Sequence, residues 1–91
     1  MEELTGFQRD LLYVIAGLDE PHGLGVKEEL EAYYETEINP GRLYPNLDTL
    51  VEAGLVEKGT KDRRTNTYAI TADGQEQLKS REGWKAQYLS D

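Results

Sequence analysis

The chain has 91 residues and a formal net charge of -8, with 18 Asp and Glu against 10 Lys and Arg. That length allows one domain with a modest core, and we expect no second domain. The absence of cysteine and the single histidine exclude a disulfide framework and a Cys/His zinc site built within the chain. No run of about eighteen apolar residues and no secretory signal is present, so we expect a cytoplasmic protein that spans no membrane.

The acidic charge is unevenly distributed along the chain. Residues 1–57 hold thirteen Asp and Glu against three Lys and Arg, a balance of -10, and residues 67–91 come to -1. The stretch between them, residues 58–66, has a balance of +3 from four cations and one carboxylate, which are Lys58, Lys61, Arg63, Arg64 and Asp62. Polyanion binding depends on Lys and Arg, so we expect a nucleic-acid partner to contact this basic segment.

The first predicted helix covers about residues 5–18. Thr5 followed three residues later by Gln8 is a capping-box pattern. Apolar residues then recur at helical spacing, namely Phe7, Leu11, Val14, Ile15 and Leu18. The segment 19–23, which contains Pro21, His22 and Gly23, ends this helix and is interpreted as a turn.

A second helix is predicted from Leu24 to about Thr36, with Val26, Leu30 and one of Tyr33 or Tyr34 buried. Its other face carries four carboxylates, Glu28, Glu29, Glu31 and Glu35. Four carboxylates this close are compatible with a cation site. A solvated helical face explains them more simply, and we expect no metal site.

The third predicted helix begins at Asn39, a favourable N-cap, with Pro40 at the first helical position, and it ends before Gly54. Its apolar stripe consists of Leu43, Leu47, Leu50 and Val51. The opposite face presents Gly41, Arg42, Pro45, Asp48, Thr49 and Glu52, with Tyr44 and Asn46 on its flanks. The first two turns therefore offer polar side chains and free backbone N–H groups, which suit contacts with phosphates and base edges. An ordinary amphipathic surface helix would show the same stripe.

Beyond Gly54 the pattern becomes typical of β-structure. Residues 55–58 and 67–71 are predicted strands, and the basic segment joins them as a loop from Gly59 to Asn66. Thr71 is a plausible N-cap for a last helix that runs from about Ala72 into the eighties. Its apolar residues are few, namely Leu78, Trp84, Tyr88 and Leu89. Pairing with a second copy would bury them.

Three helices, a hairpin with a basic tip and a trailing helix predict an α+β, mainly α fold, a winged helix-turn-helix with a C-terminal dimerisation helix. The single domain spans residues 1–91, with residues 5–71 as the winged-helix core and residues 72–91 as the C-terminal helix. In such a fold the third helix enters the major groove, and the hairpin tip, or wing, contacts phosphates or the minor groove.

Several segments resemble the PadR family of winged-helix transcriptional regulators. The match runs from about residue 5 to residue 80, and its most specific parts are Gly41-x-Leu43-Tyr44-Pro45 and Tyr68-x-x-Thr71-x-x-Gly74 after the wing. The resemblance implies a homodimeric DNA-binding repressor without cofactor, of a short form in which the last helix dimerises by itself or with the first helix. The acidic, lysine-poor composition adds the hypothesis that the protein comes from a halophile.

The expected partners are double-stranded DNA and a second copy of the chain. The DNA-binding residues expected on the third helix are Asn39, Gly41, Arg42, Tyr44, Asn46 and Thr49. Those expected on the wing are Lys58, Lys61, Arg63, Arg64 and Thr65, and those expected at the dimer contact are Leu78, Trp84, Tyr88 and Leu89. Some relatives hold phenolic or multidrug ligands at the dimer interface. Two aromatic residues on the last helix are usually packing residues, so the sequence does not indicate a small-molecule effector.

The alternative is a winged-helix protein-interaction module that binds no DNA, which the acidic total favours and the basic wing opposes. An enzyme is not expected, because no cysteine exists and no nucleophile has a base at a recognisable spacing. No catalytic residue is therefore assigned.

The halophile hypothesis predicts a melting temperature that rises from low salt to molar KCl, because salt screens the repulsion among the carboxylates. Thermal unfolding followed by circular dichroism measures it. Equal melting temperatures in both buffers would contradict the hypothesis.

Overall fold

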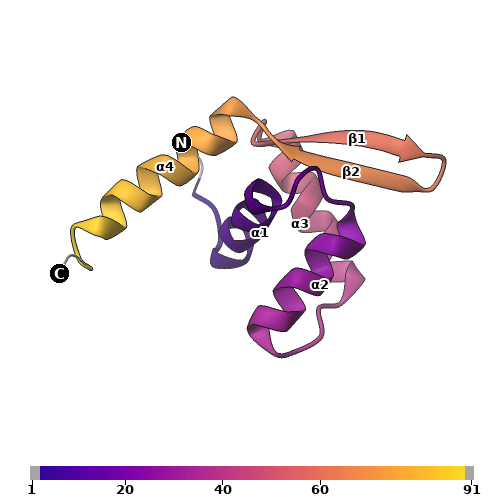
Figure 1. The fold of residues 1–91 in the computed structure, drawn as a ribbon, viewed down its shortest axis with the longest axis horizontal. Helices are drawn as coiled ribbons and strands as arrows, with labels where there is room; N and C mark the ends of the chain where they lie inside the picture. The colour runs from indigo at the N-terminus through magenta and orange to yellow at the C-terminus, as the bar shows by residue number, and fades with distance from the viewer. Residues whose placement is uncertain (1–2, 90–91) are drawn as a thin grey trace.

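The structure is a computed structural model that describes residues 3–89, so positions 1, 2, 90 and 91 of the predicted domain lie outside the described residues. Figure 1 shows the helices gathered beside one hairpin, with α4 and the hairpin extending to opposite sides. The elements in chain order are α1 (Gly6–Gly17), α2 (Gly23–Tyr34), α3 (Pro40–Glu52), β1 (Val56–Asp62), β2 (Thr65–Ile70) and α4 (Ala72–Ala86). This confirms the predicted α+β, mainly α architecture.

Side chains cap every helix at its N-terminus, as backbone N–H groups without helical partners require. The predicted caps Thr5, Asn39 and Thr71 are confirmed, and Thr5 forms the full capping box with Gln8. The prediction missed the cap of α2. Nδ1 of His22 accepts a hydrogen bond from the Gly25 N–H at 2.8 Å, so this residue begins the helix rather than merely occupying a turn.

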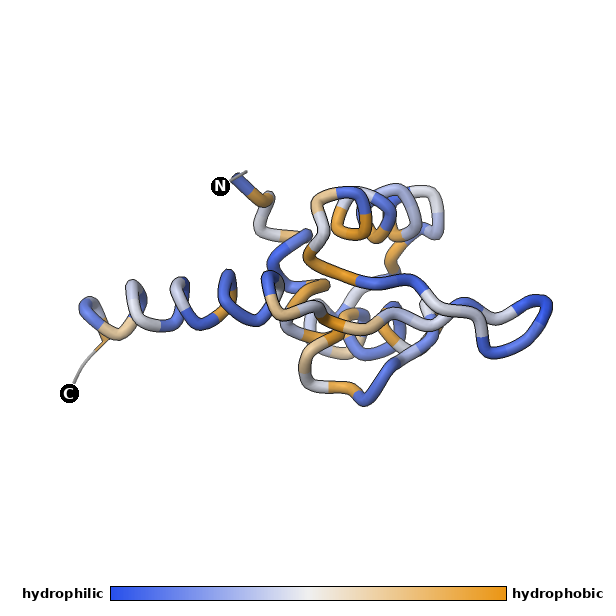
Figure 2. The backbone as a smooth tube through the Cα atoms, turned by 90° about the horizontal axis from the view of Figure 1, so that it is seen from above, coloured by the Kyte–Doolittle hydropathy of each residue, from blue (hydrophilic) through white to orange (hydrophobic). Residues whose placement is uncertain are grey.

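One hydrophobic core joins the three helices to the hairpin. Leu43, Leu47 and Leu50 of α3 are fully buried, as the stripe predicted, and Tyr68 of β2 closes the core from the wing side. Each fully buried leucine contributes about 1.5–3 kcal/mol to stability, so this packing fixes α3 against the body. Figure 2 shows the apolar segments concentrated in the body and the hairpin tip hydrophilic.

The hairpin is longer than predicted. β1 pairs with β2 in antiparallel register from Val56 opposite Ile70 to Asp62 opposite Thr65, with an irregularity between Thr60 and Asp62. The predicted loop 59–66 is therefore wrong in its extent, because only the two residues Arg63 and Arg64 form the turn. Most of β1 is exposed, so its polar residues lack the apolar alternation by which strands are recognised. Backbone hydrogen bonds rather than burial hold this part of the ladder.

A close backbone contact sets the direction of α4. The Thr71 hydroxyl donates to the Gly54 carbonyl at 2.7 Å, and the Thr71 N–H donates to the Leu55 carbonyl at 3.0 Å. Gly74 lies against the same Leu55 carbonyl, and a Cβ at that position would come within 2.3 Å of its oxygen. Farther along, the Tyr13 hydroxyl of α1 donates to the Glu82 carboxylate at 2.8 Å, which ties the outer part of α4 to the body.

Gly74→Ala is expected to lower the free energy of unfolding by about 1–3 kcal/mol, because the new methyl group would force Leu55 and Ile70 away from α4. Gly83→Ala in the same helix is the matched control. Nothing lies within 4 Å of its added Cβ, and helix propensity predicts a gain of up to about 1 kcal/mol. Chemical denaturation measures both values, and wild-type stability of Gly74→Ala would contradict the packing described here.

Candidate nucleic-acid interface

The face of α3 turned away from the core is narrow and carries small, uncharged side chains in its first turns. Gly41, Pro45 and Thr49 follow one another at four-residue spacing, and all three are exposed. The Thr49 hydroxyl donates back to the Pro45 carbonyl at 3.0 Å. The Asn39 side chain accepts from the Gly41 N–H at 2.7 Å and so occupies one of the free donors at the helix start. Asn39 thus acts as a cap in this structure.

Asn46 lies on the flank that faces α1 and is half-buried there. The Gln8 side-chain amide donates to Asn46 Oδ1 at 2.9 Å, and Asn46 Nδ2 donates to the Arg42 carbonyl at 2.7 Å. Gln8 Oε1 accepts from the Thr5 N–H at 3.1 Å, which fixes which end of the Gln8 amide donates. The capping box of α1 therefore holds the Asn46 amide in one orientation.

Arg42 lies on the same flank, and its guanidinium stacks on the Phe7 ring at 3.9 Å from the ring centre. Stacking of this kind leaves the N–H groups at the edge of the guanidinium free to bind an anion. Tyr34 lies beside Phe7 and donates its hydroxyl to the Asp10 carboxylate. Burial, and then this carboxylate, raise the pKa of Tyr34 to about 12, so the hydroxyl stays protonated.

Tyr44 lies on the other flank of α3 and faces the start of α2. A Cβ on Gly23 would lie 2.8 Å from the Tyr44 ring, so glycine at this position allows the ring to lie close to the α2 backbone. A groove of about 470 Å³ separates Tyr44 from the wing. Its walls come from α2, α3 and the hairpin, through His22, Gly23, Leu24, Tyr44, Arg64, Thr65, Asn66 and Tyr68.

The wing is attached to the start of α2 as well as to its own hairpin partner. The Tyr68 N–H donates to the Pro21 carbonyl at 2.9 Å, and His22 forms an isolated antiparallel bridge with Thr67. On the other side, Lys58 Nζ lies 3.9 Å from the Asp48 carboxylate of α3, an exposed and therefore weak pair. The hairpin is thus fixed to the start of α2 and has a weaker polar contact with α3.

The wing tip is a tight turn held by Asp62. Its carboxylate accepts from the backbone N–H groups of Arg64 at 2.9 Å and Thr65 at 3.0 Å. Hydrogen bonds from these backbone groups, the one from Arg64 first, hold the pKa of Asp62 below its usual range. The side chains of Lys61, Arg63 and Arg64 are exposed around this turn, and Thr65 is half-buried. The structure therefore brings Lys61, Arg63 and Arg64 together at the wing tip, whereas Lys58 lies apart from them, opposite Tyr68 and beside Asp48.

The residues predicted at a dimer contact differ in exposure. Trp84 is 52% exposed, Tyr88 68% and Leu89 81%. Leu78 is only 8% exposed and packs in the core of its own chain, so little of its side chain is available to a partner. The Trp84 and Tyr88 rings meet edge to face at 5.2 Å between centres, so they form one aromatic surface near the end of α4.

The sequence predicted three of the four helix caps in the described part of the chain but gave no indication of two positioning residues of α1, Phe7 and Gln8. Their local roles, an apolar residue and a capping partner, were visible, but their contacts with α3 join residues that are far apart in the chain. Within residues 3–89, no cluster of three His, Cys, Asp or Glu residues could hold a metal ion. In the same part of the chain, no helix is both long and apolar enough to span a membrane.

Comparisons with known proteins bear on this arrangement. Residues 11–80 match the Transcriptional regulator PadR-like family. A solved complex of hsRosR-S1 is 47% identical with a TM-score of 0.90, and the match covers 97% of this chain and 79% of that one. H. salinarum RosR grown from NaBr is 46% identical with a TM-score of 0.91, and the match covers 99% and 82%. A search of curated proteins found no match.

A more distant structure shows the fold alone. F93 from STIV, described as a winged-helix DNA-binding protein, is 13% identical with a TM-score of 0.78, and the match covers 98% of this chain and 97% of that one. Helix order, hairpin and these likenesses define a winged-helix DNA-binding protein. The chain belongs to the PadR-like family of transcriptional regulators, a family of regulators rather than enzymes. Its similarity to a protein of H. salinarum fits the halophile hypothesis.

Proposed function

We propose that the protein is a sequence-specific repressor that binds duplex DNA with the first turns of α3 in the major groove and the wing on the adjacent backbone or minor groove. The observation that carries this proposal is the groove bordered by Tyr44 on α3, by Gly23 at the start of α2 and by Arg64 at the wing tip. One duplex can contact all three elements at once, and the strongly acidic remainder of the chain would repel it.

The residues divide by the contact that they offer. Lys58, Lys61, Arg63 and Arg64, with Thr65, supply affinity for the phosphate backbone. Arg42, held flat on Phe7, and Tyr44, held over Gly23, orient α3 from its two flanks, with the Asn46 amide fixed beside Arg42. Asn39 caps the helix and Gly41 permits close approach to the sugar-phosphate chain.

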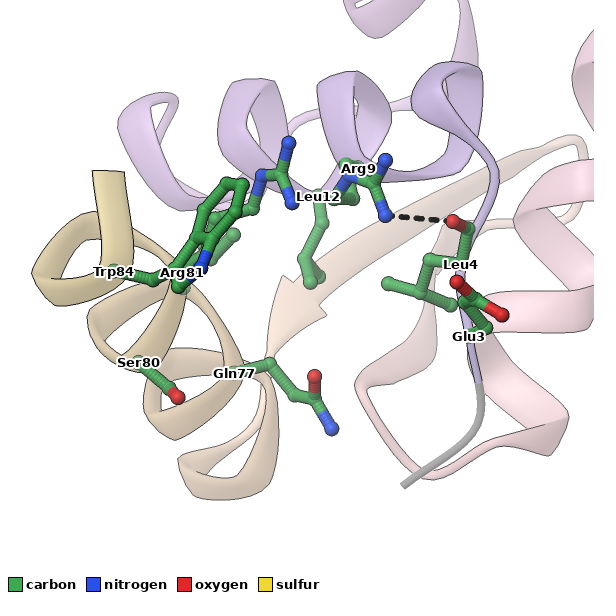
Figure 3. A pocket seen from close by; sticks show the side chains of 9 residues that line it. Glu3, Leu4, Arg9, Leu12, Gln77, Ser80, Arg81 and Trp84 are labelled. Carbon is green, nitrogen blue, oxygen red and sulfur yellow. Dashed lines mark hydrogen bonds between the residues drawn. The ribbon is translucent and has the colours of Figure 1, made fainter. Parts of the chain in front are cut away.

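A homodimer would place two copies of α3 about 34 Å apart, one turn of DNA, and would block polymerase at an operator of matching symmetry. Trp84, Tyr88 and Leu89 provide the exposed apolar surface for such pairing. Beside them a groove of about 330 Å³ lies between α4 and the amino-terminal part of the chain (Figure 3). Leu4 and Leu12 line it, and Arg9 donates to the Leu4 carbonyl at 2.7 Å. Trp84, Tyr88 and Leu89 of a second copy would fill this groove.

The protein would act in the cytoplasm and without catalysis. The competing function, a protein-interaction module, is favoured by the net charge of -8. A mobility-shift assay with genomic fragments, including the protein's own promoter, distinguishes the two. Fragments that remain retarded in the presence of excess random DNA support the proposal. The proposal would be contradicted if no fragment were retarded at any salt concentration.

Arg63→Ala is expected to weaken binding to operator and random DNA alike and to reduce the slope of log K against log salt by about 0.9, the value for one lost phosphate contact. Lys79→Ala, which removes an exposed cation from α4, is the matched control and should leave the slope unchanged. Fluorescence anisotropy over a salt series measures both. A slope unchanged by Arg63→Ala would contradict a phosphate contact from the wing.

The double variant Tyr88→Ser/Leu89→Ser is expected to sediment as a monomer, while the wild-type chain of 10.3 kDa sediments at twice that mass. Leu24→Ser, at a position 52% exposed on α2, is the control and should stay dimeric. Trp84 is the only tryptophan, so its emission should shift to the blue as the wild-type concentration rises and the indole leaves water. A wild-type monomer with constant emission at high micromolar concentration would contradict the dimer.

A further inference from the structure

The outermost surface of α3 offers apolar groups where hydrogen-bonding side chains are usual in base readers. Gly41 has no side chain, and Pro45 has a hydrocarbon ring and no backbone N–H. Thr49 has a hydroxyl, but its proton is donated to the Pro45 carbonyl at 3.0 Å. The hydroxyl oxygen can still accept a hydrogen bond, and beside it the methyl group of the exposed Thr49 is available for an apolar contact.

The polar residues of the same helix are occupied at its sides. Gln8 and the Arg42 carbonyl hold the Asn46 amide, and Phe7 holds the Arg42 guanidinium toward α1. Asp48 and Glu52 lie toward the C-terminal end of α3, and their negative charges would be repelled by phosphate. What remains between the flanks is a short ridge made by the Pro45 ring and the Thr49 methyl group.

In the major groove, the one apolar feature of a base edge is the C5-methyl group of thymine. We propose that Pro45 and Thr49 read thymine by contact with this methyl group. The proposal rests on the proposed function, since it needs α3 in the major groove. Such a contact is apolar, so its discrimination persists at high salt while the phosphate contacts of the wing weaken.

The test uses a duplex selected by this protein from a random library, in which each thymine is replaced by uracil one at a time. Uracil lacks only the methyl group, so charge and base pairing stay the same. At one or two thymines per half-site the replacement is expected to weaken binding about fourfold, the factor for one apolar carbon group returned to water. The ratio should be equal in low and in molar KCl.

Thr49→Ser removes the protein methyl group and keeps the hydroxyl. It should bring the thymine-to-uracil ratio at its site to about one, whereas Thr49→Val should keep the ratio. Thr36→Ser, at an exposed position between α2 and α3 to which no binding role is assigned, is the matched control and should leave every ratio unchanged. Pro45→Ser replaces the apolar ring by a hydroxymethyl group and should lower the ratio at a neighbouring thymine.

If the protein binds the selected duplex but no uracil replacement changes its affinity, or Thr49→Ser leaves all ratios intact, thymine reading is excluded while DNA binding stands. If no duplex can be selected, the proposed function itself fails, and thymine reading fails with it.

Discussion

Repulsion between carboxylates and phosphates is the constraint on which the arrangement of this molecule depends. With a net charge of -8, most of the chain disfavours contact with a nucleic acid. A DNA-binding face therefore has to be small and confined to one part of the surface. The structure meets this by projecting the hairpin away from the body and placing Arg63 and Arg64 in its two-residue turn.

A projecting hairpin helps only if it is held in a fixed position relative to α3, the helix that we propose to enter the major groove. Three sets of contacts provide this. Tyr68 anchors the wing in the core and to Pro21, Thr71 and Gly74 lock the strand-to-helix junction on Leu55, and the capping box of α1 reaches Asn46 through Gln8. Because these contacts are made within the chain, the face is formed before DNA arrives, and less conformational freedom is lost on binding.

Much of the fold could be predicted from the sequence, because its signals are local. The apolar stripe of α3 and the caps Thr5, Asn39 and Thr71 follow from residue types at short spacing, and the structure confirms them. The length of the hairpin could not be predicted, since its outer ladder is polar on both faces. The stacking of Arg42 on Phe7 joins two helices and leaves no short-range pattern. The sequence also could not distinguish Leu78, which is buried in the core, from the exposed apolar residues at the end of α4.

Backbone amide NMR shifts, followed as a selected duplex is added, test most directly whether one face built from α3, the start of α2 and the wing tip meets DNA. The account predicts the largest shifts within residues 22–24, 41–49 and 61–66, with little change along the carboxylate-bearing residues 28–35. Shifts confined to α4, or largest within residues 28–35, would contradict it.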